Sequence, residues 1–133
     1  MRQQQDYILR LIEQLGAMIR AALGRREVLK TEEHGGLAGQ ALGLVLSMDP
    51  EMASNLSPQS LVALLELTEV DARVLALLQE ALDVEATALG DQGDLTTAML
   101  RRDQAEAIRS LLEKGAADSS GGAPGDVDVS YTA

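Results

Sequence analysis

The chain has 133 residues, no Cys, Trp or Phe, and a formal net charge of −10 at pH 7. The lack of cysteine excludes disulfides, thiolate metal sites and a cysteine nucleophile, and the acidic surface argues against nucleic-acid binding. Leu and Ala, which favour helices, supply most of the apolar residues, and the only aromatic residues are Tyr7 and Tyr131. This composition predicts an all-α fold with about five helices.

The first expected helix covers about residues 4–33, because apolar residues recur at helical spacing from Ile8 onward. Gly24 is a weak point, but one glycine costs a helix only about 1 kcal/mol. The apolar stripe predicts either core packing or a homodimer interface, and a membrane-surface helix is disfavoured by the acidic remainder of the chain. Tyr7 fits core packing with its hydroxyl at the rim, or an interface anchor. The candidate interface residues are Tyr7, Ile8, Leu11, Ile12, Leu15 and Ile19.

The sequence His34-Gly35-Gly36 predicts a break before a short apolar helix over about residues 37–48. Residues 49–56 then form an expected connection. Ser57-Pro58 places a capping residue before a first-turn proline, which predicts the start of a helix over about 58–67. That helix is apolar nearly all round, so we expect it to be deeply buried.

A helix over about residues 71–89 follows, with Thr68 or Asp71 at its start, and Gly90 to Asp94 predict a turn. Asp94 can cap a last helix over about 95–114, which Gly115 should end. Residues 1–114 thus form one expected helical domain, and the breaker-rich residues 115–133 an expected disordered tail. The expected inward residues of the last helix are Leu95, Ala98, Met99, Ala105, Ile108, Leu111 and Leu112.

Two segments echo each other, because Gly36 and Ala41 have the same five-residue spacing as Gly93 and Ala98. The glycine permits a turn, and the alanines, with Ala105 farther along, permit close packing of two helices. Each segment resembles a tetratricopeptide-like helical hairpin. With QDYILRLIEQLG near the start and LSPQSLVALLEL in the middle, the chain over about residues 4–114 resembles a family of small bacterial all-helical proteins of unknown function. The resemblance implies two such hairpins linked by a short buried helix, and it brings no catalytic residues.

No motif supports catalysis, a cofactor or a metal site. The single histidine, His34, follows two glutamates without the HExxH spacing, so we expect a helix-end or turn histidine. The middle of the chain is rich in carboxylates, and their spacing is typical of a solvated helix face rather than an acid/base pair. These carboxylates are Glu66, Glu69, Asp71, Glu80, Asp83 and Glu85.

The charge is unevenly distributed: residues 1–30 carry six Lys/Arg against three Asp/Glu, and residues 31–93 carry one Arg against eleven acids. We therefore expect a non-enzymatic protein–protein interaction or scaffold module that binds another protein or forms a homodimer. The alternative is a regulatory protein that binds a small apolar ligand between its helices. No apolar run is long enough to span a bilayer and no signal-peptide pattern occurs, so we expect a cytoplasmic protein.

Overall fold

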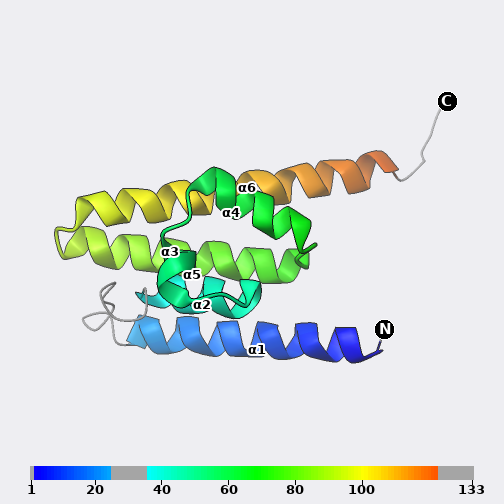
Figure 1. The fold of residues 1–133 in the computed structure, drawn as a ribbon, viewed down its shortest axis with the longest axis horizontal. Helices are drawn as coiled ribbons and strands as arrows, with labels where there is room; N and C mark the ends of the chain where they lie inside the picture. The colour runs from blue at the N-terminus through cyan, green and yellow to red at the C-terminus, as the bar shows by residue number, and fades with distance from the viewer. Residues whose placement is uncertain (1, 25–35, 123–133) are drawn as a thin grey trace.

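A computed structural model of the chain describes residues 2–24 and 36–122 (Figure 1). Six helices run in the order α1 (Arg2–Gly24), α2 (Gly36–Leu46), α3 (Pro50–Ser54), α4 (Pro58–Leu67), α5 (Ala72–Asp91) and α6 (Leu95–Gly122). The described residues contain no strand, so the predicted all-α fold with about five helices is confirmed. None of the described helices is both long and apolar enough to cross a bilayer.

The helix α5 lies at the centre and contacts α1, α2 and α6 (Figure 1). It forms an antiparallel hairpin with α6. The shorter helix α2 packs against α1 and α5, and α3 packs on α2. The helix α1 contacts α5 more extensively than it contacts α2. The α5–α6 hairpin, which is the second of the two expected hairpins, is therefore the central unit of the fold. By contrast, α1 and α2 are held together largely through their contacts with α5.

Leucine and alanine fill the core, as the composition suggests. Small buried side chains occur on both helices of the central hairpin, and they allow the two helix axes to approach closely. The largest fully buried apolar side chains are Leu15, Leu42, Leu61, Leu65, Leu78, Leu82, Leu89 and Ile108. The buried alanines include Ala38, Ala41, Ala53, Ala81, Ala86, Ala98 and Ala105.

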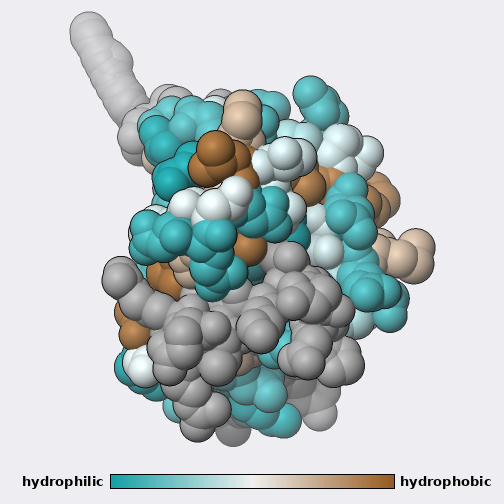
Figure 2. Space-filling model, turned by 90° about the vertical axis from the view of Figure 1, so that its left-hand side faces the viewer, coloured by the Kyte–Doolittle hydropathy of each residue, from teal (hydrophilic) through white to brown (hydrophobic). Residues whose placement is uncertain are grey.

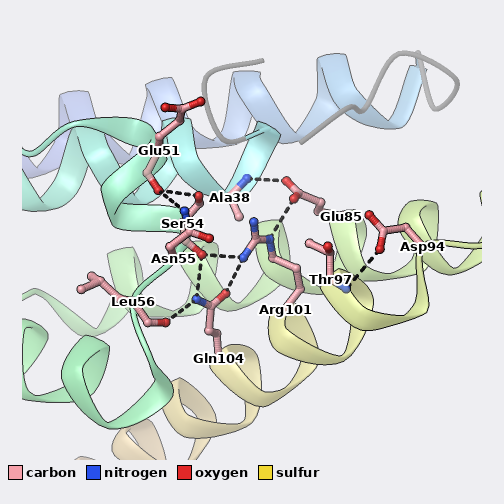
Figure 3. Close-up of polar contacts among 10 residues, drawn as sticks. All are labelled: Ala38, Glu51, Ser54, Asn55, Leu56, Glu85, Asp94, Thr97, Arg101 and Gln104. Atoms are coloured by element: carbon pink, nitrogen blue, oxygen red, sulfur yellow. Dashed lines mark hydrogen bonds and ion pairs between the residues drawn. The ribbon is translucent and has the colours of Figure 1, made fainter. Parts of the chain in front are cut away.

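Four of the described helices begin at capping residues. At the start of α6 the predicted cap Asp94 accepts a hydrogen bond from the Thr97 amide at 3.3 Å (Figure 3). Asp49 accepts a hydrogen bond from the Met52 amide, Ser57 accepts one from the Ser60 amide, and Asp71 accepts one from the Arg73 amide. The segment 49–56, expected as a plain connection, therefore contains the short helix α3. Its aspartate cap and the proline at its first position explain the helical turn.

Three helices also end in the same way, with one residue in the left-handed conformation directly after the cap. These residues are Ser47 (φ 55°), Glu69 (φ 51°) and Gly93 (φ 90°). After each of them the next amide reaches back to a carbonyl five residues earlier, as in Met48 to Gly43 at 3.1 Å and Asp94 to Leu89 at 2.9 Å. This pattern is the Schellman motif, in which glycine normally holds the left-handed position. Only one of the three positions here is a glycine.

The expectation that the helix over 58–67 is deeply buried is wrong. Only Leu61 and Leu65 of α4 are buried, and Leu67 is 78% exposed. The cause is position: α4 packs chiefly on α6 from the outside of the fold, so a helix that is apolar nearly all round leaves one face uncovered.

The inward face expected for the last helix is partly wrong. Leu95 and Met99 are about two-thirds exposed, whereas Arg101 and Gln104 are buried. Ala98, Ala105 and Ile108 are buried as expected. The true inner face is thus rotated toward Arg101, because this side chain finds an ionic partner on α5.

One helix boundary also differs from expectation. Helix α6 continues through Gly115 to Gly122, since the cost of one glycine inside a helix is only about 1 kcal/mol and the neighbouring alanines favour helix. The disordered tail predicted for residues 115–133 is therefore wrong over residues 115–122, and residues 123–133 lie outside the described residues. The continuation of the first helix past Gly24, and the turn at His34, also lie outside the described residues.

Candidate functional site

A polar cluster is buried where α5 and α6 meet α2 and α3 (Figure 3). The Arg101 Nε donates to Glu85 Oε2 at 2.8 Å, and Arg101 Nη1 donates to Gln104 Oε1 at 3.1 Å. All three side chains are buried. Removing a charged pair from water is costly, and it is tolerated only when the geometry and the remaining hydrogen bonds compensate.

The second carboxylate oxygen of Glu85 binds the start of α2. Glu85 Oε1 accepts a 2.7 Å hydrogen bond from the Ala38 amide, one of the unpaired amides in the first turn of that helix. Gly36 precedes it with φ 69°, and a Cβ at Gly36 would lie 2.7 Å from Glu85 Oε1. Glycine is therefore needed at position 36 for two reasons. It adopts the positive φ without strain, and it leaves space for the Glu85 carboxylate.

Arg101 and Gln104 bind the chain that leaves α3. The Ser54 carbonyl accepts from Arg101 Nη1 at 2.7 Å and from Gln104 Nε2 at 3.1 Å, and the Leu56 carbonyl accepts from Gln104 Nε2 at 2.8 Å. One cluster on the central hairpin thus secures both ends of the α2–α3 segment. Both oxygens of Glu85 are occupied, so the cluster is suited to holding the fold rather than to proton transfer.

This cluster was not predicted, because the spacing of the carboxylates indicates a solvated face for Glu85. The positional signal was present: Glu85 lies three residues after Leu82 and four before Leu89, both buried on α5. Arg101 likewise lies between the buried alanines of α6. These positions place one charged residue on the inner face of each helix, but whether the two residues meet depends on how the helices are aligned.

Groups of His, Cys, Asp and Glu that could hold a metal ion do not occur among residues 2–24 and 36–122. The remaining acids expected on a solvated face are exposed or half-buried. Asp71 caps α5 and also pairs with Arg73 at 3.0 Å. The side-chain hydrogen bond from Arg73 is the main cause that lowers the pKa of the Asp71 carboxyl.

An open hollow of about 440 Å³ lies between the α4–α5 turn and the C-terminal half of α6. We call it the acidic groove. Its charged lining residues are Glu66 and Glu69. Its apolar lining comes mainly from Leu65, Val70, Leu75, Leu111, Leu112 and Ala116.

A second hollow of about 480 Å³ lies between α4 and α6. It shares Glu66 and Leu111 with the acidic groove, and Val62 and Lys114 also line it. Lys114 Nζ lies 3.5 Å from Glu66 Oε2, and both side chains are well exposed. The outer surface where α4 meets α6 therefore offers two adjoining apolar depressions.

The candidate interface residues of α1 have different environments. Leu11, Leu15 and Ile19 are buried in the core of the chain, Ile8 and Ile12 are half-buried, and Tyr7 is 52% exposed. Tyr7, Ile8 and Leu11 line a small hollow of about 150 Å³ that shares Glu69 and Val70 with the acidic groove. Half of the apolar stripe is thus used inside the chain, and Tyr7 lies outside the core.

The turn and close-packing residues are placed as follows. Gly36 begins α2 and Gly93 lies in the α5–α6 turn, both with positive φ. The buried small residues that follow them are Ala41, Ala98 and Ala105. The two glycines differ in surroundings, since no atom lies within 4 Å of a Cβ built at Gly93.

Figure 2 faces one end of the molecule, and there the hydrophobic residues form separate spots among hydrophilic ones. No protein family, curated protein or solved structure matches the chain. The resemblance to small bacterial helical proteins therefore stays a prediction.

Proposed function

We propose that the chain is a non-enzymatic protein-interaction module that receives an apolar segment of another chain in the acidic groove. The groove itself is the observation that carries this proposal. Its walls are apolar side chains on α4, α5 and α6. Apolar surface of this kind, bordered by charged residues, is typical of protein interaction sites.

The groove supports the proposal better than the apolar stripe of α1 does. Leu11, Leu15 and Ile19 are already covered within the chain, so they offer little surface to a second copy. The groove residues Val70, Leu111 and Leu112 are only half-buried. A homodimer through the groove is one form of the proposed function, since a second copy is a protein partner too.

Site-specific photo-crosslinking tests the proposal. A photoreactive amino acid at Ala116, which is exposed and lines the groove, would capture the partner in cells that contain the protein. The control position is Thr96, an exposed residue at the other end of the same helix. We expect an identified protein, or a second copy of the chain, to crosslink at position 116 and not at 96. Equal capture at both positions, or none, would reject the proposal.

A small apolar ligand is the second candidate, because about 440 Å³ falls within the size range of small-molecule sites. Native mass spectrometry of the purified protein distinguishes the two. A bound small molecule that is lost from a Leu112→Glu variant, together with no crosslinked protein, would favour the ligand. The Leu95→Glu variant is the control, since Leu95 is exposed elsewhere on α6.

A further inference from the structure

The strongest feature outside the buried cluster is the residue at the edge of the acidic groove where α4 ends. Glu69 takes the left-handed position of the Schellman motif, with φ 51°. Its amide donates to the Glu66 carbonyl at 3.1 Å, and the Val70 amide donates to the Leu65 carbonyl at 3.3 Å. Glycine is the usual residue at this position because a side chain there is strained. The sequence nevertheless places a carboxylate there.

The Glu69 carboxylate forms no hydrogen bond or ion pair within the part of the chain that the structure describes. Glu69 is exposed, and no ion pair or hydrogen bond involves its side chain among residues 2–24 and 36–122. Strained backbone that no internal contact explains is a reason to look for an external role. The side chain lines the groove, so an external role there is a contact with whatever enters it.

The charge of the groove identifies the class of that occupant. Both charged lining residues, Glu66 and Glu69, are acidic, and the chain as a whole carries a net charge of −10. The 3.5 Å pair of Glu66 with Lys114 joins two well-exposed groups, and such pairs are weak. Glu66 is therefore available to an incoming cation, and the overall field attracts cationic partners.

The elements that line the acidic groove indicate the secondary structure of the segment that binds there. Residues 2–24 and 36–122 contain no strand, so they offer no sheet edge to which a partner could add a strand. Helices α4, α5 and α6 instead form an apolar depression, the surface that receives the apolar face of an amphipathic helix. We infer that the occupant is a cationic amphipathic helix of a partner protein, whose Lys or Arg side chains pair with Glu66 and Glu69. This inference rests on the proposed function.

Two model peptides test the inference. One is an 18-residue helix with leucine on one face and lysine on the other, and its twin carries glutamate in place of lysine. Fluorescence anisotropy with the full chain at low ionic strength measures both affinities, and crosslinking from position 116 checks that the lysine peptide occupies the groove. We expect the lysine peptide to bind at least about tenfold more tightly, with its affinity falling as salt is added.

Matched variants separate the groove from the general acidity of the chain. The double variant Glu66→Gln/Glu69→Gln should weaken the lysine peptide by about two- to fivefold for each carboxylate. The control Asp91→Asn/Asp103→Asn makes the same change in net charge at exposed positions that do not line the groove, and it should weaken binding much less.

Three results would overturn the inference: equal binding of the two peptides, equal effects of the two double variants, or no saturable binding of the lysine peptide. Each of these differs from a failure of the proposed function. If position 116 captures a partner whose contacting segment lacks Lys and Arg, the interaction module stands and the cationic helix is rejected.

Discussion

Glu85 on α5 and Arg101 on α6 form an ion pair, with 2.8 Å between Oε2 and Nε, and both side chains are almost fully buried. Each partner also binds backbone of the α2–α3 segment, Glu85 at the Ala38 amide and Arg101 at the Ser54 carbonyl. The pair therefore joins the central hairpin to the segment packed against it. Replacing only one of the two residues leaves the other buried charged residue without its partner.

We expect Arg101→Met to lower the free energy of unfolding by about 3–5 kcal/mol, because Glu85 is then left in the core without its ionic partner. Glu85→Met should be similarly harmful. In the double variant no unpaired charge remains, so its loss should fall short of the sum of the single losses by about 0.5–3 kcal/mol. Urea denaturation of the four proteins measures this coupling, and additive losses would show that the pair does not act as a unit.

Gly36→Ala should destabilise the protein by about 1–3 kcal/mol, since it combines a left-handed backbone with a collision against a buried carboxylate. The new Cβ would lie 2.7 Å from Glu85 Oε1. The control is Gly90→Ala inside α5, where no atom lies within 4 Å of a Cβ. It should raise stability by up to about 1 kcal/mol. Thermal unfolding compares the two, and equal effects would contradict the role assigned to Gly36.

Glu69→Gly should stabilise the chain by about 1 kcal/mol, because glycine adopts the left-handed conformation without strain. Glu69→Gln keeps the strain and removes only the charge, so it should change stability little. Urea midpoints of the two variants separate backbone strain from electrostatics. If Glu69→Gly is no more stable than Glu69→Gln, the position is not strained and the argument for an external role of Glu69 is weakened.

Leu15→Ala should cost about 2–5 kcal/mol, because Leu15 is fully buried within the chain. Leu9→Ala on the exposed side of α1 should change stability by less than about 0.5 kcal/mol. If Leu15 instead lay between two copies, the unfolding midpoint would depend on protein concentration. Denaturation at two concentrations, with light scattering at low and high salt, checks this prediction.

The lowered pKa of Asp71 predicts an acid-dependent contribution to stability. A carboxyl whose pKa is lower in the folded state stabilises the fold at pH values above its ordinary value of 3.8. The contribution is lost as the pH falls through the lowered pKa. We expect the stability difference between the original chain and Asp71→Asn, measured in urea between about pH 2 and pH 6, to shrink below 3.8. A constant difference would contradict this.

Local patterns in the sequence predicted most of the helices. Ser57-Pro58 marks the start of α4 because both residues act on the first turn alone, one as a hydrogen-bond acceptor and one through its fixed φ. Asp71 and Gly93 delimit α5 and its turn by equally local means. Such signals need no information about distant residues, so they could be recognised before the fold was known.

The acidic groove could not have been predicted, because it arises from residues that lie far apart in the chain. Leu65 and Leu111 contribute to one hollow only because α4 crosses α6. The sequence suggested a deeply buried α4, and periodicity alone does not show which side of an apolar helix stays uncovered. The left-handed glutamate at position 69 was equally hidden, since glycine is the usual signal there.

By itself the sequence determined an all-α chain of Leu- and Ala-rich helices, because helix propensity, capping and turn formation depend on neighbouring residues. Only the tertiary structure decided that Glu85 and Arg101 are buried while Leu67 and Leu95 are exposed. A buried charge is stable only opposite its partner, and an apolar side chain is covered only where another element lies over it. Both conditions are set by the packing of the helices.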